Sequence, residues 1–149
     1  MQKNEKPVFV DDYFAALLAQ ASQLISAEFH KVVVGSGLSV PEWRMLATLA
    51  GGRSMSLGRL AQISVTKQPT VSRLLDRMEQ RAYVERVADE EDRRITRVRI
   101  TPQGQQVVST LIEQARKHEK KVLSALDMEQ AQQLKATLQR IIELHRPPA

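Results

Sequence analysis

Cysteine is absent from this chain of 149 residues. Its absence excludes disulfide bonds, thiol nucleophiles, thiolate-ligated zinc and redox sensing by a thiol. It also agrees with a reducing compartment, so we expect a cytoplasmic protein. Aromatic residues make up only 4% of the chain, which means that its core has to be built from aliphatic side chains.

Long hydrophobic runs are absent as well. No stretch approaches the roughly 18 consecutive apolar residues that a transmembrane helix needs. The first residues, MQKNEKP, are polar and lack the apolar segment of a secretory signal, so we expect no membrane partner. Glycine and proline are scarce, at six residues each, and the many helix formers that remain predict a mainly α-helical fold in one compact subunit.

Patterns of catalytic and metal-binding residues are also missing. His30, His118 and His145 lie in predicted helices without a second ligand at a metal-binding spacing such as i, i+4. The serines have no convincing histidine partner, and no glycine-rich loop could hold a phosphate. The acidic residues from Asp89 to Asp92 could attract a divalent cation, but the adjacent arginines oppose this. We therefore expect no enzyme activity, no metal and no cofactor.

An excess of positive charge is present. The chain carries 22 Lys and Arg against 17 Asp and Glu, a net charge of +5, and a dimer would carry twice as much. A basic surface favours a polyanionic partner such as nucleic acid. Many basic proteins bind no nucleic acid, however, so the positions of the charges are more informative than their number.

The segment from Ser64 to Gly104 organises these charges. Its first part has apolar residues at the i, i+3, i+4, i+7 spacing of an amphipathic helix: Val71, Leu74, Leu75 and Met78. We expect Thr66 to cap this helix and Pro69 to lie in its first turn. The opposite face carries side chains that can bond to base edges and phosphates: Lys67, Gln68, Thr70, Ser72, Arg73, Asp76 and Arg77.

Position along this helix separates two roles. We expect the residues near its N-terminus to contact base edges in the major groove of DNA: Lys67, Gln68, Thr70 and Arg73. Ser72 and Arg77 are better placed to contact phosphates, with Asp76 holding an arginine in place. A solvated amphipathic helix would look similar in isolation, so this interpretation depends on the segment that follows.

Two short strands follow, at residues 83–87 and 95–100. In the second strand, Thr96, Val98 and Ile100 alternate with Arg97 and Arg99, which is the period of two typical of a half-buried strand. The intervening ADEEDRR is too polar to be buried and should project as a loop. A basic helix leading into such a hairpin predicts a winged helix-turn-helix, in which the helix enters a major groove and the hairpin, or wing, reaches the neighbouring minor groove.

The wing resembles a family signature. The run D-x-x-D-R-R-x-x-x-x-x-x-T-x-x-G is similar to the wing motif of the MarR family of transcriptional regulators, and it is present here as Asp89, Asp92, Arg93, Arg94, Thr101 and Gly104. The segments QPTVSRLLDRME and PEWRMLATLA match that family's pattern as well. The resemblance covers about residues 11–145. It departs at Ala82, where the family usually has a glycine that ends the recognition helix in a left-handed turn.

The resemblance implies roles for the wing residues. Arg94 is expected to enter the minor groove, braced by Asp92, and a guanidinium favours the narrow, strongly negative minor groove of A·T-rich DNA. Arg93 would contact a phosphate or pair with Asp89. The competing interpretation is a solvated run of charges whose internal ion pairs contribute little.

The resemblance also implies a small-molecule effector. The family often binds aromatic acids or other anionic ligands between its dimerisation helices and the winged domain. His30, Trp43 and Arg44 could line such a pocket and offer a hydrogen bond, a stacking surface and a cation. The alternative is that Trp43 belongs to the core and that Arg44 pairs with a nearby acid.

Capping residues delimit the other helices. Helices are expected from Asp11 or Asp12 to about Val34, from the Ser39–Glu42 capping box to Gly51, from Ser56, from Thr101 to Leu126, and from Asp127 to His145. The first helix and the last two cannot all bury their apolar stripes on one small winged domain. The last helix also repeats Leu134, Leu138 and Ile141 at the spacing of a coiled-coil seam. We therefore expect a homodimer rather than a monomer with a helical appendage.

Together these features predict a mainly α fold with a small β-hairpin wing, a winged helix-turn-helix with N- and C-terminal dimerisation helices. Residues 1–10 would form a flexible arm, 11–36 and 102–149 the dimerisation region, and 37–101 the DNA-binding region. The predicted function is sequence-specific transcriptional regulation by a repressor that binds a pseudo-palindromic operator in double-stranded DNA and is released by a small aromatic or anionic ligand. The alternative is an architectural protein that binds DNA without preference for sequence.

Overall fold

The structure is a computed structural model that describes residue 6 and residues 8–148. Its elements, in chain order, are α1 (Phe9–Asp12), α2 (Phe14–Gly35), α3 (Val40–Leu49), β1 (Met55–Ser56), α4 (Leu57–Ser64), α5 (Gln68–Gln80), β2 (Val84–Ala88), β3 (Thr96–Ile100), α6 (Pro102–Val122), the 3-10 turn η1 (Leu123–Ala125) and α7 (Met128–His145). This order confirms the predicted mainly α fold with a small β hairpin.

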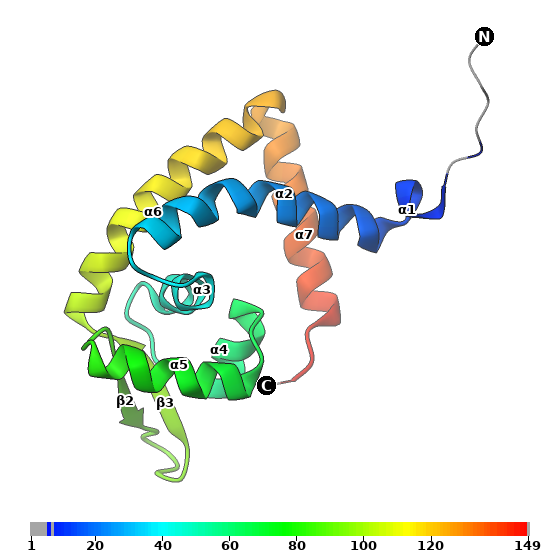
Figure 1. The fold of residues 1–149 in the computed structure, drawn as a ribbon. Helices are drawn as coiled ribbons and strands as arrows, with labels where there is room; N and C mark the ends of the chain where they lie inside the picture. Colours follow the sequence, from blue (N-terminus) through cyan, green and yellow to red (C-terminus); the bar gives the residue numbers. More distant parts are fainter. Residues whose placement is uncertain (1–5, 7, 149) are drawn as a thin grey trace.

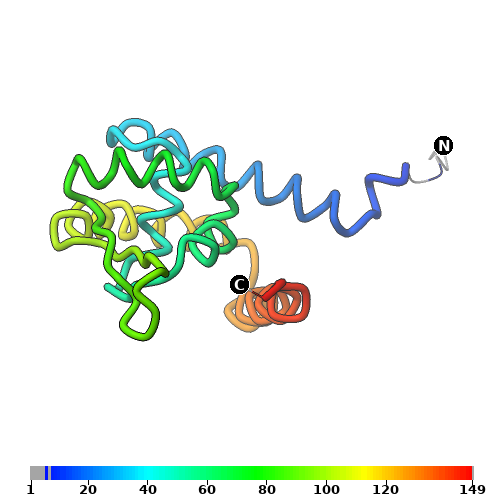
Figure 2. Tube along the Cα trace, turned by 90° about the horizontal axis from the view of Figure 1, so that it is seen from below, coloured from blue at the N-terminus to red at the C-terminus, as the bar shows by residue number. Residues whose placement is uncertain are grey.

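The helices are arranged around α3. Figure 1 shows α2 and α6 arching over α3, while α4, α5 and the β2–β3 hairpin lie on the opposite side. From the far end of α6, α7 turns back toward α4. We call the elements from α3 to β3, residues 40–100, the winged part. In the perpendicular view of Figure 2, α7 is seen nearly end-on beside the winged part, and the first half of α2 extends away from the other elements.

An aliphatic core holds the winged part together, as the low aromatic content predicted. All four apolar residues of the α5 stripe are buried, and the side chains of α3, α4, β3 and α6 surround them. The largest fully buried side chains are Met45, Leu46, Leu49, Leu60, Leu75, Met78, Val33, Val71, Val84, Val98 and Val108. Because this stripe is buried, the opposite face of α5 is directed outward.

Side-chain caps set the start of most helices, as predicted. Ser39 and Glu42 form a reciprocal capping box on α3, while Ser56, Thr101 and Asp127 cap α4, α6 and α7. The prediction for α5 was wrong. Its N-cap is Lys67, which makes no side-chain cap bond. Thr66 instead closes the end of α4, where its backbone N–H donates to Ala61 O (3.0 Å) and its hydroxyl donates to Ser64 O (3.1 Å).

Two helix boundaries also differ from the prediction. The first helix begins earlier and is interrupted: Phe9–Asp12 forms a separate turn, and Tyr13 is extended (φ −81°, ψ 116°) before α2 starts. Phe9 and Val10 are therefore helical rather than part of an arm, while residues 1–5 and 7 of that arm lie outside the described residues. At the other end, α6 stops at Val122, and the predicted continuation is the η1 turn.

The sheet has three antiparallel strands in the order β1-β3-β2. In the hairpin, Val84 pairs with Ile100 and Ala88 pairs with Thr96. On the other side of β3, Met55 pairs with Val98. The sequence did not reveal β1, because two residues are too few to show an alternation.

A close approach fixes the turn between α5 and the hairpin. Thr101, the N-cap of α6, donates its backbone N–H to Tyr83 O (3.0 Å), so the start of α6 contacts this turn. A Cβ atom on Gly104 would lie 2.1 Å from Tyr83 O, so only glycine fits there. Ala82, within the turn, has a left-handed φ of 61°, so the left-handed turn is present even though an alanine replaces the glycine usual in the family.

We expect the substitution Ala82→Gly to stabilise the protein. The substitution removes the strain of a left-handed alanine, roughly 1–2 kcal/mol. Part of this gain, roughly 0.5–1 kcal/mol, is lost because glycine gives the unfolded chain more conformational freedom. The free energy of unfolding should therefore rise by about 0.5–1 kcal/mol, measured by chemical denaturation at one fixed protein concentration. Ala88→Gly, at the exposed end of β2, is the control and should be neutral or destabilising. Equal effects of the two substitutions would contradict this assignment of strain.

Candidate nucleic-acid interface

The outward face of α5 presents most of the residues predicted to contact DNA. Lys67, Gln68, Arg73 and Arg77 are exposed, while Thr70 and Ser72 are half-buried. Among the described residues, no side chain caps the N-terminus of α5. The positive end of the helix dipole and the first backbone N–H groups are therefore available to a phosphate.

Acidic residues on α5 fasten this helix to the wing. Arg86 of β2 bonds to Asp76 (2.7 Å) and forms a second ion pair with Glu79 (3.4 Å). Asp76 thus holds an arginine, as predicted, but the arginine comes from β2 rather than from α5. These groups are well exposed, so the pairs orient the two elements more than they stabilise the fold.

Carboxylates organise the tip of the wing. Asp89 Oδ1 accepts hydrogen bonds from the backbone N–H groups of Asp92 (3.0 Å) and Glu91 (2.8 Å). Asp92 in turn accepts from the backbone N–H of Arg94 (3.0 Å), from its Nε (3.1 Å) and, at Oδ2, from its Nη2 (3.2 Å). The backbone bonds to Asp89 and the bonds from Arg94 to Asp92 lower the pKa values of these carboxyl groups.

Arg94 is held and exposed at the same time. Its side chain is 90% exposed, yet three N–H groups of this residue donate to Asp92. A guanidinium pre-oriented in this way loses less conformational freedom on binding than a free arginine side chain. The contact predicted between Asp92 and Arg94 is therefore present, and its role toward DNA remains a proposal.

Asp89 does not pair with Arg93. Its partner is Arg97 of β3, with Nη1 3.5 Å from Asp89 Oδ2. Arg93 is exposed and forms no ion pair within residues 8–148, which leaves a phosphate as the remaining predicted partner.

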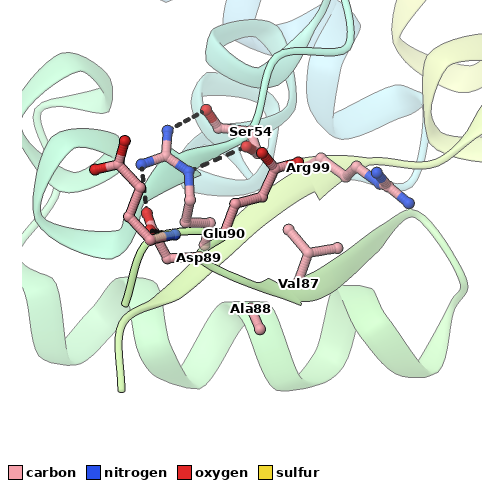
Figure 3. A pocket seen from close by; sticks show the side chains of 8 residues that line it. Ser54, Val87, Ala88, Asp89, Glu90 and Arg99 are labelled. Carbon is pink, nitrogen blue, oxygen red and sulfur yellow. Dashed lines mark hydrogen bonds and ion pairs between the residues drawn. The ribbon is translucent and has the colours of Figure 1, made fainter. Parts of the chain in front are cut away.

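Arg97 is a functional candidate that the sequence did not distinguish. Its Nε donates to Ser54 Oγ (3.1 Å) and its Nη2 to Ser54 O (2.7 Å), beside the pair with Asp89. Figure 3 shows Ser54 and Asp89 close together, beside the point where the wing loop leaves β2, with these contacts dashed. The alternation along β3 places Arg97 and Arg99 on one face, so the sequence does not distinguish them. Arg97 differs by its contact with Ser54, which is 43 residues away in the chain.

A second candidate site lies between α2 and α3. An open cavity of about 500 Å³ is lined by Ala19, Ser22, Gln23, Ser26, Ala27, His30, Val40 and Arg44. The structure therefore brings His30 and Arg44 together, as predicted. Burial and the charge of Arg44 lower the pKa of His30, so its neutral form is favoured.

Trp43 does not line this cavity. It packs at the edge of the core against Phe29, with ring centroids 5.3 Å apart. The alternative interpretation, that Trp43 is a core residue, therefore fits the structure better than a stacking role in the pocket. Arg44 forms no ion pair with an acid in the described part of the chain, so its charge is free to meet a ligand in the cavity.

Other kinds of site find no support in the described residues. Within residues 8–148, no three His, Asp or Glu side chains are grouped so that they could hold a metal ion. None of the helices described combines the length and the hydropathy that crossing a membrane requires.

Known proteins share this arrangement. The sequence model of the MarR family matches residues 36–95. The crystal structure of the MarR family transcriptional regulator SPO1453 from Silicibacter pomeroyi DSS-3 is 38% identical and superimposes with a TM-score of 0.80, covering 93% of this chain and 98% of the other. The homoprotocatechuate degradative operon repressor of Escherichia coli is 26% identical over 133 residues, which is 89% of this chain and 90% of that protein.

A more distant structure shows the same fold. NadR, crystallised in complex with 4-hydroxyphenylacetate, is 19% identical and has a TM-score of 0.78, covering 95% of this chain and 96% of the other. The decisive similarity is the one at 38% identity over nearly the whole length of both chains. It agrees with the family match over the winged part, and the chain belongs to the MarR family of transcriptional regulators.

Proposed function

We propose that this regulator is a homodimeric repressor that binds a pseudo-palindromic operator in double-stranded DNA and that a small anionic ligand releases it. The observation that carries this proposal is the placement of two elements that expose cationic side chains, Arg73 and Arg77 on α5 and Arg93 and Arg94 on the hairpin. The outward face of α5 and the tip of the β2–β3 hairpin lie on the same side of the molecule (Figure 1). One duplex can therefore contact both elements at once.

The two elements would read DNA in different ways. The major groove is wide enough for an α-helix and carries a distinct pattern of bonding groups for each base pair. We assign base contacts there to Lys67, Gln68, Thr70 and Arg73. Ser72, Arg77 and Arg93 would contact phosphates, which position the protein without reading sequence. Arg94, braced by Asp92, would enter the adjacent minor groove.

Unpartnered apolar surface supports the homodimer. No residue of α7 is buried. The terminal helices also expose large apolar side chains by 41% or more: Phe9, Val10, Tyr13, Phe14, Leu17, Leu24, Ile25, Val32, Val34, Met128, Leu134, Ile142 and Leu144. Large apolar surfaces left in water often mark sites of protein–protein interaction. A two-fold dimer would bury these side chains and present two α5 helices to two half-sites, which requires a pseudo-palindromic operator.

The cavity between α2 and α3 supports control by a ligand. It offers one permanent cation, Arg44, and one histidine, His30, beside aliphatic side chains and the polar side chains of two serines and a glutamine. A carboxylate with an apolar body matches that combination. Because α2 belongs to the proposed dimerisation region and α3 to the winged part, a ligand between them would change the spacing of the two α5 helices and release the operator.

Selection of preferred sites from a pool of random duplexes tests this function. A repressor should recover one pseudo-palindromic site and bind it roughly a thousandfold or more tightly than random DNA at the same salt concentration. Recovery of no preferred sequence, with affinity that depends only on salt, would favour an architectural protein that recognises charge and shape.

The contact between Asp92 and Arg94 predicts that removal of a negative charge weakens DNA binding, which is the opposite of what charge alone predicts. Arg94→Ala should weaken binding to the selected duplex by about 1–3 kcal/mol, most strongly when its flanks are A·T-rich. Asp92→Ala removes a negative charge that repels DNA, yet it should also weaken binding, because Arg94 loses its brace. Fluorescence anisotropy on duplexes with A·T-rich and G·C-rich flanks measures both effects.

Glu90→Ala is the matched control for Asp92→Ala, since it removes one exposed acid from the same loop. It should leave binding unchanged or tighten it slightly. If Asp92→Ala behaves like Glu90→Ala and Arg94→Ala shows no dependence on the flanks, the wing is only a solvated loop.

The dimer depends on the proposed seam of α7. Leu138 is half-buried on this helix, and Leu138→Glu would place an unpaired charge in an apolar interface at a cost of several kcal/mol. Analytical ultracentrifugation should show dissociation or unfolding. Gln139→Glu, at the next and exposed position, is the control and should remain dimeric. An intact dimer of the Leu138→Glu variant would refute this seam.

The ligand site predicts how His30 titrates. Arg44→Gln removes a repulsive charge, so the pKa of His30 should rise, while burial keeps it below its usual value. An aromatic carboxylate bound beside it should also raise the pKa, and 4-hydroxyphenylacetate is a suitable first probe. NMR titration of the imidazole measures both shifts, with Arg116→Gln on α6 as the control. A titration that responds to neither change would argue against this cavity as the effector site.

A further inference from the structure

We propose that Arg97 is the positioning residue of the wing: it ties the hairpin to the body of the winged part and so sets where Arg94 meets DNA. This inference rests on the proposed function, because it takes Arg94 to be a DNA contact. The side chain of Arg97 is much less accessible than that of Arg94, at 34% exposed against 90%. It therefore acts through the residues that it holds.

The first half of the link joins Arg97 to the body. Two of its N–H groups donate to Ser54, to Oγ at 3.1 Å and to the backbone oxygen at 2.7 Å. Ser54 directly precedes β1, whose Ser56 pairs with Arg97 across the sheet and caps α4. Because α4 is packed on the core through Leu60, Ser54 is a fixed point relative to α5.

The second half joins Arg97 to the tip. Its Nη1 lies 3.5 Å from Asp89 Oδ2, while the other oxygen of Asp89 holds the backbone N–H groups of Glu91 and Asp92. Asp92 then holds the backbone and the guanidinium of Arg94. A continuous series of contacts therefore leads from the body of the domain to the most exposed arginine of the wing.

An arginine suits this position for a geometric reason. The guanidinium is planar and presents its N–H groups in a rigid fork, so one side chain can bridge two acceptors that lie in different directions. A lysine keeps the charge but has a single flexible ammonium, which cannot hold Ser54 and Asp89 in the same fixed geometry.

Arg99 provides a matched comparison on the same strand. It lies two residues further along β3, carries the same charge and forms its ion pair with Glu85 of β2. That pair joins the two strands of the hairpin to each other. It does not join the hairpin to the body, so Arg99 should not affect the position of the wing.

Binding measurements with four variants test the proposal. The probes are the selected duplex with A·T-rich flanks and the same duplex with G·C-rich flanks. Arg97→Gln should remove the preference for A·T-rich flanks, with a loss of roughly 5- to 150-fold on that duplex, as expected for one arginine contact. Arg97→Lys should fail to restore the preference. Arg99→Gln and Arg99→Lys should keep it, with any loss equal on both duplexes.

Two further readouts separate positioning from a direct contact. The preference for the central bases, which α5 would read, should be unchanged in every Arg97 variant. The double variant Arg94→Ala/Arg97→Gln should lose no more of the flank preference than Arg94→Ala alone, because both changes remove the same contact. Restoration by Arg97→Lys would instead mean that Arg97 contributes only its charge to DNA, which would overturn the proposal.

Amide hydrogen exchange tests the same link without DNA. The N–H groups of Glu91 and Asp92 should exchange faster in Arg97→Lys than in the parent protein, and Arg99→Lys should leave them unchanged. Unchanged exchange in Arg97→Lys would refute the positioning role. If Arg94→Ala shows no flank dependence, the proposed wing contact fails, and exchange alone decides whether Arg97 holds the wing. Should Arg97→Gln not fold, Ser54→Ala removes one acceptor only and should show a smaller loss of flank preference.

Discussion

Burial of one face of α5 is the constraint on which the rest of this structure depends. Val71, Leu74, Leu75 and Met78 are buried in the aliphatic core, and each contributes roughly 1.5–3 kcal/mol by leaving water. The ion pairs that Asp76 and Glu79 of this helix form with Arg86 are open to solvent and contribute at most about 1 kcal/mol each. Hydrophobic burial therefore decides where α5 sits and which face it turns outward, whereas the charges of that outward face are free to serve binding.

The wing is held by polar contacts rather than by hydrophobic burial. Its tip has no core, so its shape comes from carboxylates that accept backbone N–H groups and from arginines that bridge neighbouring segments. Such contacts add little to the free energy of folding, but they restrict the conformations of an exposed loop. Asp89 and Asp92 add negative charge to the wing, which simple electrostatics would count against DNA binding. If Arg94 contacts DNA, as proposed, these carboxylates would lower the conformational entropy lost on binding, because Asp89 orders the loop and Asp92 holds Arg94.

How far the sequence predicts this molecule depends on the range of each interaction. The α5 stripe, the capping box at Ser39 and the cap at Asp127 are local patterns, and all were predicted correctly. The hairpin strands were placed to within one residue, because β3 alternates clearly. What was missed depends on distant partners: the two-residue strand β1, the contact of Arg97 with Ser54 and the partner of Asp89 all involve residues far apart in the chain or on different strands. Thr66 was assigned to the wrong helix because a threonine between two helices can serve either, and packing of the turn decides. His30 and Arg44 both line the cavity, as predicted, but Trp43 does not line it and instead contacts Phe29.

The proposed control by a ligand follows from where the cavity lies. One wall is α2, whose outer half exposes apolar side chains that a second copy would cover, and the other wall is the start of α3. Glu42 on α3 is 3% exposed and forms an ion pair with Arg81 at the end of α5 (3.8 Å), and the guanidinium of Arg81 stacks over the ring of Tyr83 (4.7 Å). A change in the distance between α2 and α3 would therefore act on α3, which contacts α5 through the core and through the buried carboxylate of Glu42. The dimer would hold α2 in place, and the operator would hold α5. A ligand that changes the distance between α2 and α3 would therefore weaken one of these two contacts. The binding energy of the ligand would then be set directly against that of the operator.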